Sequence, residues 1–415
     1  MNLPTLQFDS DLILAEGDLL DEPQISPLDT DSIDINGNPI RRIVGEFWTA
    51  GQRQASSIQE VSYRACFKPQ LPAYFIKRFT SQGGVVYDPF SGRGTTIIEA
   101  ALWGRRVVAN DVNPLSTILA RPRLNAPDLD NIAARLKTMP IEADLRPDMD
   151  LSMFYEEHTA AEIMSLRKYL KRCRDTGVED DVDSWIRMVA TNRLTGHSPG
   201  FFSVYTFPPN QAVSASSQIK INERRDQQPE YRDTKAIIVK KSRQLLGGLN
   251  RSDISNLRAA AGTAMFLTGS ADSTTTIPDG YVDLTVTSPP FLDIVQYAED
   301  NWLRCWFNDL PLEEISSRIT MARTVEAWSD IMGRVFDELF RVTRSGGIVA
   351  FEVGEVRNGK VKLEDHVIPL GVQSGFQCEA VLINSQQFTK TANLWGVSNN
   401  KAGTNSNRIV VLRKP

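Results

Sequence analysis

Two short segments of this chain contain residues whose types and spacing could do chemistry. The first, residues 88–96, reads DPFSGRGTT and lies between the apolar run 85–87 and the helical pattern 97–103. Gly92 and Gly94 would let the backbone turn sharply and approach a ligand, because they carry no Cβ. The free N–H groups at the start of the following helix form an electropositive end. The segment lacks the Lys-Ser/Thr pair of a P-loop, so we do not expect phosphate cradling of that kind.

A carboxylate follows this loop at the spacing of a ribose-binding residue. Asp111 comes directly after the next predicted strand, residues 106–109, and lies about 20 residues beyond the glycines, where it could accept hydrogen bonds from ribose hydroxyls. The alternative is a side chain that only caps the following turn. Strand, loop, helix, strand and acid together predict a βαβ unit that binds an adenosine-containing cofactor. At this point nicotinamide cofactors and S-adenosylmethionine both remain open.

The second segment, residues 287–291, reads TSPPF and follows the predicted strand 282–286. Two consecutive prolines cannot extend a central strand, so the strand must end there. Pro289 would fix a carbonyl in space, Ser288 adds a side-chain oxygen, and Phe291 offers an aromatic face. Two acceptors could take the N–H bonds of an exocyclic base amine, so that its lone pair attacks a methyl sulfonium. Such a pocket needs a base extruded from the duplex. A plain proline turn is the alternative, and the upstream loop counts against it.

The rest of the chain predicts one α/β domain with a long insertion. Residues 1–60 are acidic and rich in turn formers, which indicates an N-terminal arm. Strand and helix patterns in 61–124 form the first part of the α/β domain, and they resume in 263–415. Residues 125–262 have helical periodicity and many charges. This helical insertion is a candidate target-recognition region.

With these motifs the sequence resembles the DNA amino-methyltransferase family, especially its cytosine-N4 branch. The resemblance covers roughly residues 60–120 and 263–415. It implies a class I S-adenosylmethionine-dependent fold, with a doubly wound, seven-stranded, mostly parallel sheet, helices on both faces and an antiparallel C-terminal hairpin. The cofactor loop precedes the catalytic tetrapeptide here, whereas many cytosine-N4 enzymes have the reverse, permuted order. For this reason the family does not locate the target-recognition region in this chain.

The resemblance also assigns site residues. It places catalysis on Ser288, Pro289, Pro290 and Phe291. It places S-adenosyl-L-methionine against Pro69, Asp88, Pro89, Phe90, Ser91, Gly92, Gly94, Thr95, Thr96, Asp111, Asn113 and Asp272. In the family, the segment around Pro69 borders the methionine end of the cofactor, and an acid at the position of Asp272 faces the adenine amine.

Contacts with DNA would have to come from a local basic face, because the formal net charge is -5. The candidates for this face are Arg193, Lys220, Arg224, Arg225, Lys240 and Lys241. A solvated helix surface is the alternative for these residues. A second proline pair in residues 207–210 has no side-chain acceptor before it and no aromatic residue after it, so we do not expect it to be catalytic.

Several classes of protein are disfavoured. The four cysteines are scattered, so neither a zinc site nor a disulfide scaffold is expected. No cysteine follows a proline, which speaks against the covalent mechanism of cytosine-C5 methylation. The first 20 residues do not resemble a secretory signal, and no apolar run is long enough to span a bilayer. We therefore expect a cytoplasmic protein that binds neither metal nor membrane.

The sequence thus predicts a DNA methyltransferase that acts on the N4 amine of a flipped-out cytosine. Ser288 favours cytosine, because adenine-N6 enzymes commonly have aspartate at that position. The alternatives are adenine-N6 methylation, methylation of an RNA base amine or of protein, and a non-catalytic DNA-binding protein that keeps the fold. The expected partners are DNA and a cognate restriction endonuclease. No residue is predicted to act as a dedicated base, so the amine proton is expected to leave to solvent.

Overall fold

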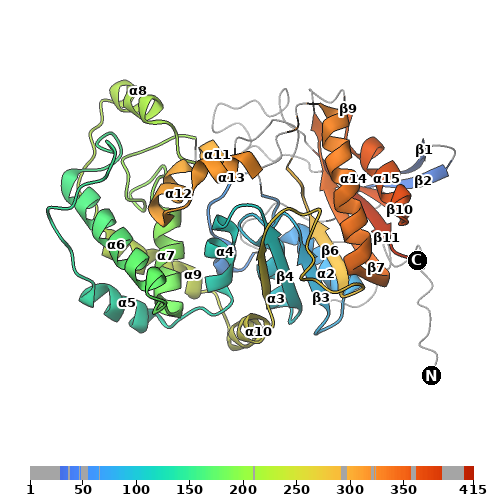
Figure 1. Ribbon diagram of the computed structural model, residues 1–415, viewed down its shortest axis with the longest axis horizontal. Coiled ribbons are helices and arrows are strands. Elements are labelled where there is room, and N and C mark those ends of the chain that lie inside the picture. The colour runs from blue at the N-terminus through green and yellow to red at the C-terminus, as the bar shows by residue number, and fades with distance from the viewer. Residues whose placement is uncertain are drawn as a thin grey trace.

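The computed structural model describes residues 29–415 except 36–37, 46, 48–54, 65, 209–210, 291–296, 319–321, 323, 357–360 and 386–405. Figure 1 shows a central sheet with helices on both faces and a separate group of helices at one end of the molecule. None of the helices in the described residues is both long and apolar enough to cross a membrane.

Nine strands of the described chain form one mixed sheet in the order β1-β2-β10-β11-β7-β6-β3-β4-β5. Their bounds are β1 Asp29–Ile35, β2 Asn38–Gly45, β3 Val85–Asp88, β4 Arg106–Asp111, β5 Met265–Thr268, β6 Val282–Thr287, β7 Thr343–Val353, β10 Gln377–Ser385 and β11 Ser406–Arg413. Strands β5, β4, β3, β6 and β7 run parallel, and β11 is antiparallel to both of its neighbours, β7 and β10. A small separate sheet pairs β8, Glu355–Val356, with β9, Val361–Lys362. The predicted doubly wound sheet with its antiparallel C-terminal hairpin is confirmed.

The sheet has two more strands than the seven expected. Strands β1 and β2 form an antiparallel hairpin, and β2 adds in parallel to β10 at the sheet edge. Residues 29–35 and 38–45 of the predicted N-terminal arm thus form two strands of the sheet. Ile40 and Ile43 of β2 are buried, so this part of the N-terminal region contributes to the core.

Alternating side chains of the central strands bury the two faces of the sheet. Val86 packs in one apolar cluster with α2, Gln70–Phe79, and α3, Thr95–Leu102. Its neighbours Val85 and Tyr87 pack in the other cluster, with α14, Val325–Val342, and α15, Glu364–Gln373. Successive side chains of β3 point to opposite faces of the sheet, and helices cover both faces. For this reason the short run 85–87 is apolar throughout.

The strand order reverses at β3, which pairs with β4 on one side and β6 on the other. The chain leaves β3 toward β4 and β5 and returns to β6 only after the insertion. The carboxyl ends of β3 and β6 therefore lie side by side with connections that lead away in opposite directions. Such a switch point is where open α/β sheets bind ligands.

Six helices lie between β4 and β5 after the short helix α4, Leu115–Ala120, and the 3-10 turn η3, Arg121–Arg123. They are α5 Leu129–Thr138, α6 Glu157–Asp175, α7 Asp181–Arg193, α8 Ala215–Arg225, α9 Thr234–Leu246 and α10 Arg251–Ala261. Figure 1 shows α5 to α9 grouped at the end of the molecule away from α14 and α15, whereas α10 lies below α3. Hydrogen bonds join the helices of the group: the Tyr169 hydroxyl donates to Asp183 at 3.0 Å, and Arg187 donates to the Leu170 carbonyl at 2.8 Å.

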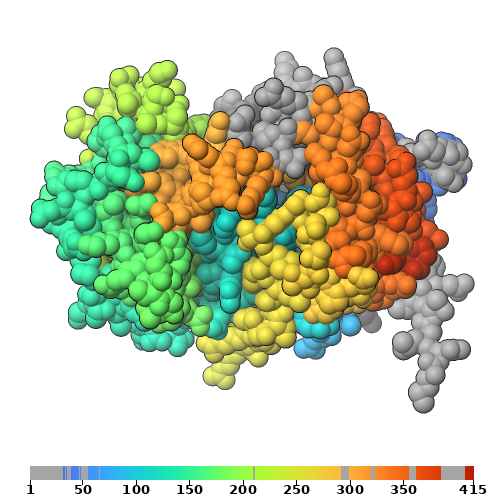
Figure 2. All heavy atoms as spheres, in the orientation of Figure 1, coloured from blue at the N-terminus to red at the C-terminus, as the bar shows by residue number. Residues whose placement is uncertain are grey.

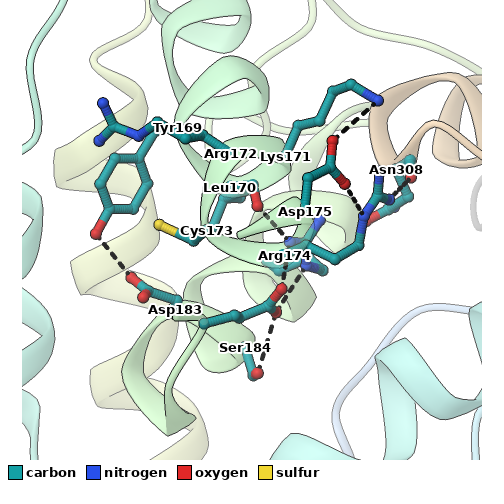
Figure 3. Close-up of polar contacts among 12 residues, drawn as sticks. Tyr169, Leu170, Lys171, Arg172, Cys173, Arg174, Asp175, Asp183, Ser184 and Asn308 are labelled. Atoms are coloured by element: carbon teal, nitrogen blue, oxygen red, sulfur yellow. Dashed lines mark hydrogen bonds and ion pairs between the residues drawn. The ribbon is translucent and has the colours of Figure 1, made fainter. Parts of the chain in front are cut away.

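The chain that follows residues 288–291 also packs on this group. It forms α11, Tyr297–Asp300, α12, Trp302–Asn308, and α13, Leu312–Arg318. Arg174 of α6 donates to the carbonyl of Asn308 at 2.8 Å, as Figure 3 shows, and the Asn308 amide donates to Thr191 of α7 at 2.9 Å. Figure 2 shows the orange surface of this segment lying against the green insertion. The residues expected as the second part of the α/β domain therefore include a stretch that covers the insertion.

Gly94 starts α3 in a left-handed conformation, with φ of 81°. A Cβ atom there would lie 2.6 Å from the Cβ of Ala120 in α4. Gly83 has a similar φ of 79° but has no atom within 4 Å of the same position. Alanine substitutions at the two glycines can therefore separate the free-energy cost of the left-handed conformation from the cost of the close approach to Ala120.

We expect Gly83→Ala to lower the free energy of unfolding by about 1 kcal/mol, the cost of a left-handed residue. Gly94→Ala should lower it by about 3 kcal/mol, because overpacking against α4 adds to that cost. Urea unfolding followed by circular dichroism measures both. Equal losses in the two variants would show that α3 and α4 can separate freely.

Candidate active site

Asp88 ends β3 and connects the two predicted motifs. Its Oδ1 accepts hydrogen bonds from the Phe90 N–H at 3.1 Å and from the Thr287 hydroxyl at 2.6 Å. Thr287 is the residue immediately before Ser288, so one buried carboxylate holds the start of the cofactor loop and the end of β6 together. Burial raises the pKa of Asp88 to about 7, and the hydrogen bonds from Thr287 and Phe90 oppose this rise. A second link runs from the Thr96 hydroxyl to the Val286 carbonyl at 3.1 Å.

Asp111 ends β4 and turns its carboxylate back to the loop. One oxygen accepts from the Gly92 N–H at 2.8 Å, and the other accepts from the Asn113 N–H at 2.9 Å. Burial raises the pKa of Asp111 to about 6, against the two backbone hydrogen bonds. Asn113 in turn accepts from the Leu115 N–H at 3.0 Å, at the start of α4. The sequence left open whether Asp111 caps a turn or faces a ligand, and it does the first while also lining the pocket.

A pocket opens at the carboxyl ends of the central strands, between the glycine loop and residues 288–290. The residues that line it are Tyr63, Cys66, Phe67, Asp88, Pro89, Phe90, Ser91, Gly92, Thr95, Asp111, Val112, Asn113, Gly269, Ser270, Ala271, Ser288, Pro290 and Arg318. Two buried polar atoms of this set, the Ser91 Oγ and the Asn113 Nδ2, have no hydrogen-bond partner within the described residues. A polar ligand in the pocket would satisfy them.

A hydrogen bond from α14 holds the turn that follows β6. The indole N–H of Trp328 in α14 donates to the Pro290 carbonyl at 3.0 Å. Ser288 is half-buried and faces the pocket, whereas Pro289 is buried and does not line it. Phe291 lies outside the described residues.

Glu352 of β7 is a functional candidate that the sequence analysis missed. It is buried, and its carboxylate interacts with Asn407 of β11 and with Ser288. Burial raises the pKa of Glu352, and the hydrogen bonds from Asn407 and Ser288 counteract it. A charged residue within the apolar run 348–353 was the signal that could have identified it, since buried carboxylates usually need partners.

Four of the residues assigned to the cofactor do not line the pocket. Asp272 instead pairs with Arg334 of α14 at 3.2 Å, because the chain turns away after Ala271. Pro69 lines a neighbouring cavity. Gly94 and Thr96 are buried beneath the loop, where they position α3. The structure brings the other eight cofactor residues together with Ser288 and Pro290.

Eight residues that line the pocket were not assigned to the site, namely Tyr63, Cys66, Phe67, Val112, Gly269, Ser270, Ala271 and Arg318. Tyr63 and Cys66 lie just before the segment around Pro69, so their position in the sequence was the available signal. Within the described residues, no group of three His, Cys, Asp or Glu side chains is placed to hold a metal ion.

The six basic residues proposed for DNA contact do not form one face. Lys220, Arg224 and Arg225 are exposed on α8, which lies apart from α9 in Figure 1. Lys240 is exposed on α9, but its neighbour Lys241 is buried. Arg193 at the end of α7 is also buried, and both buried cations line the neighbouring cavity. Successive residues of a helix point in different directions, so clustering in the sequence did not produce one surface.

We expect the Asp88–Thr287 contact to stabilise the fold measurably. Asp88→Ala should lower the free energy of unfolding by about 2 to 3 kcal/mol, because two buried donors lose their acceptor. Asp88→Asn keeps an acceptor oxygen and removes a buried charge, so its loss should be below about 1 kcal/mol. Urea unfolding measures both. In a double-mutant cycle with Thr287→Val, purely additive losses would show that the two side chains do not interact.

Comparisons with known proteins agree with this site. Residues 17–116 match the N6_N4_Mtase family, described as DNA methylase, and this range includes the cofactor loop and Asp111. The Type II methyltransferase M.MjaII of Methanocaldococcus jannaschii is 32% identical over 77 residues, which are 19% of this chain and 14% of that protein. The Type II methyltransferase M.MvaI of Kocuria varians is 26% identical over 153 residues, 32% of this chain and 33% of its own length. The chain therefore spans at most a third of either relative.

Two solved structures are also similar to parts of the chain. TTHA0409 of Thermus thermophilus, in complex with S-adenosyl-L-methionine, has 24% identity over 35% of this chain and 51% of that one, with a TM-score of 0.23. A TehB-like S-adenosylmethionine-dependent methyltransferase of Corynebacterium glutamicum has 9% identity over 83% of this chain and 87% of that one, with a TM-score of 0.29. These scores are low, so the fold assignment depends on the strand order itself. The family match and the two Type II methyltransferases support the DNA amino-methyltransferase family for the part of the chain that contains the glycine loop.

Proposed function

We propose that this protein transfers a methyl group from S-adenosyl-L-methionine to the N4 amine of a cytosine flipped out of DNA. The observation that carries this proposal is the single pocket in which the loop residues and Asp111 meet Ser288 and Pro290. Asp88 fixes that arrangement through Thr287. The two segments are about 200 residues apart in the chain, and a purely structural role for either would not require them to share a pocket.

The residues of the pocket fit S-adenosyl-L-methionine. Asp111 would accept hydrogen bonds from the ribose hydroxyls. Ser91 and Asn113 hold buried polar atoms without a partner in the described chain, and Phe90 and Val112 supply apolar surface. When bound, this cofactor supplies an electrophilic methyl group on a sulfonium. The match of the loop region to a DNA methylase family supports a methyl donor in this pocket.

Ser288 would accept a hydrogen bond from the exocyclic amine of the target base. Its own hydroxyl proton is directed to Glu352, which leaves the oxygen lone pairs free to face the pocket. An amine that donates to such an acceptor keeps its lone pair out of conjugation with the ring, and this makes it a nucleophile. Glu352 acts here as a positioning residue, and the amine proton leaves to solvent after transfer.

The choice of cytosine depends on Ser288, which stands where adenine-N6 enzymes commonly have aspartate. Adenine-N6 methylation is the second candidate, and the family model that matches is named for both reactions. DNA as the substrate is supported by that family and by the two Type II methyltransferases. A cognate restriction endonuclease as a partner is proposed on the same basis. An RNA or protein substrate, or DNA binding without catalysis, would each give a different result in the experiment that follows.

Incubating the purified protein with DNA and methyl-labelled S-adenosyl-L-methionine tests the proposal. We expect label in N4-methylcytosine after digestion to nucleosides. Label only in N6-methyladenine would assign the second candidate. If DNA takes up no label while RNA or protein does, or if nothing is labelled, DNA methylation is excluded.

Ser288→Ala should reduce turnover by at least about 100-fold, because it removes an acceptor that acts in the transition state. Affinity for the cofactor, measured by calorimetry, should stay within about twofold of the wild type, since Ser288 is not assigned to cofactor binding. Ser255→Ala, on the exposed face of α10, is the matched control and should change neither quantity. Equal loss of turnover and cofactor affinity would mean that the tetrapeptide has a structural role only.

Cofactor affinity should depend on pH through Asp111. Its pKa of about 6 in the free protein means that the carboxyl group is protonated below that pH, and ribose hydroxyls prefer the ionised acceptor. Binding must then release a proton, so the dissociation constant should rise by up to about tenfold per pH unit below 6. Asp111→Asn should bind more weakly at pH 8 and should have a flatter profile. Calorimetry across this range measures both, and an unchanged slope in Asp111→Asn would assign the pH dependence to another group.

A further inference from the structure

A second cavity adjoins the active-site pocket and shares Tyr63 and Cys66 with it. We call it the basic chamber. Its volume is about 720 Å³. Its walls come from the connection 55–70, from the loop residue Arg93, from Arg193 and Phe201 of the insertion, and from two residues of α9. It therefore lies at the junction between the sheet and the inserted helices.

The basic chamber has an excess of positive charge in an acidic protein. The cations that line it are Arg64, Lys68, Arg93, Arg193 and Lys241. Among the lining residues, Glu60 is acidic. A second carboxylate, that of Asp300, does not line the chamber but pairs with Arg64 at 2.7 Å. Two negative charges against five positive ones leave about three uncompensated, whereas the whole chain has a net charge of -5. Charge of this density in a concave site attracts anions.

Two of these cations are held by neutral groups. Arg193 donates to the carbonyl of Asn192 at 3.0 Å and to its side-chain oxygen at 2.7 Å, and its guanidinium lies 4.0 Å from the ring centre of Phe201. Arg93 donates to the Val61 carbonyl at 2.6 Å and to the Thr95 hydroxyl at 3.0 Å. These contacts orient the guanidinium groups without neutralising them. Neither arginine forms an ion pair with another residue of the described chain, so both retain charge for a ligand.

The cost of holding these charges points to an anionic ligand. Burial lowers the pKa of Arg193 to about 10, and the charge of Arg304 adds to the effect. Burial and the charge of Arg193 lower the pKa of Lys241 to about 8. The ammonium group of Lys241 pairs with Glu60 at 3.7 Å and donates to the side-chain oxygen of Gln244 at 3.2 Å, and the pairing with Glu60 only partly offsets the lowering of its pKa. An anion in the chamber would offset this mutual repulsion.

We propose that the basic chamber binds a phosphate group, and that this phosphate belongs to the DNA strand that carries the target base. Phosphate suits the chamber because it takes hydrogen bonds from several guanidinium and ammonium groups at once. The shared wall of Tyr63 and Cys66 places the chamber directly beside the pocket that would receive the flipped base. A strand whose base enters the pocket must pass its backbone nearby. The inference depends on the proposed function for the source of the phosphate.

The test compares Lys68→Met and Lys241→Met with the control Lys137→Met. Lys137 is exposed on α5, does not line the chamber and is not among the candidates for DNA contact, and each of the three variants removes one positive charge. Lys68 is exposed at the chamber rim, and its replacement should leave folding intact even if that of Lys241 does not. The affinity of each variant for a fluorescent duplex oligonucleotide is measured by anisotropy between about 50 and 200 mM salt, in the presence of the demethylated cofactor.

Each chamber variant should reduce the slope of log affinity against log salt by about 1, as expected for the loss of one phosphate contact. Lys137→Met should leave the slope unchanged. An equal reduction in all three variants would overturn the proposal, because any surface charge would then suffice. An unchanged slope in both chamber variants would also overturn it.

Two further readouts separate this inference from the proposed function. In the first, pyrophosphate and a mononucleotide are each titrated into the protein without DNA. If Lys241→Met loses this binding but keeps the salt slope for DNA, the chamber binds free phosphate compounds, and its assignment to DNA is overturned. Base methylation and cofactor affinity are measured on the same preparations. If no base is methylated but the slope still falls in the chamber variants, the proposed function fails and the chamber stands.

Discussion

The hydrogen bond between Asp88 and Thr287 is the contact on which the rest of the site depends. It joins the ends of two parallel strands at the place where the strand order reverses. The cofactor loop begins directly after Asp88, and the tetrapeptide begins directly after Thr287, so a shift in this contact would move both. Burial disfavours the charged form of this carboxyl group and so raises the pKa of Asp88. The fold accepts that cost because the same oxygen also orders the loop through Phe90.

The insertion and the chain after the tetrapeptide act together on this site. Arg174 and Thr191 hold Asn308 at the end of α12, and Arg64 pairs with Asp300 just before that helix. Trp328 holds the tetrapeptide from the opposite side of the sheet. Residues 288–290 thus lie between the ends of the central strands and a helical layer that includes the insertion.

The sequence was sufficient for the features that depend on local pattern. The βαβ unit, the loop, Asp111 and the end of β6 follow from periodicity, glycine and proline, and the structure has them where they were expected. Features that depend on distant pairing were not visible. The β1–β2 hairpin needs β10 to cover it, and Glu352 has meaning only beside Ser288 and Asn407. Asp272 was misplaced because one residue of turning decides whether a side chain faces the pocket or α14.

The basic residues show the same limit in electrostatic terms. A sequence records the charge of Arg193 and Lys241 but not their burial, and in water such residues would contribute only to a diffuse surface potential. Burial changes their effect, because a charge shielded from solvent interacts more strongly with any group that enters its cavity. Two buried cations on different helices, aligned by Asn192 and Gln244, can therefore bind an anion more strongly than the more numerous exposed cations of α8. For an acidic chain, concentrating a few charges in a junction cavity achieves local attraction for a polyanion without a basic surface.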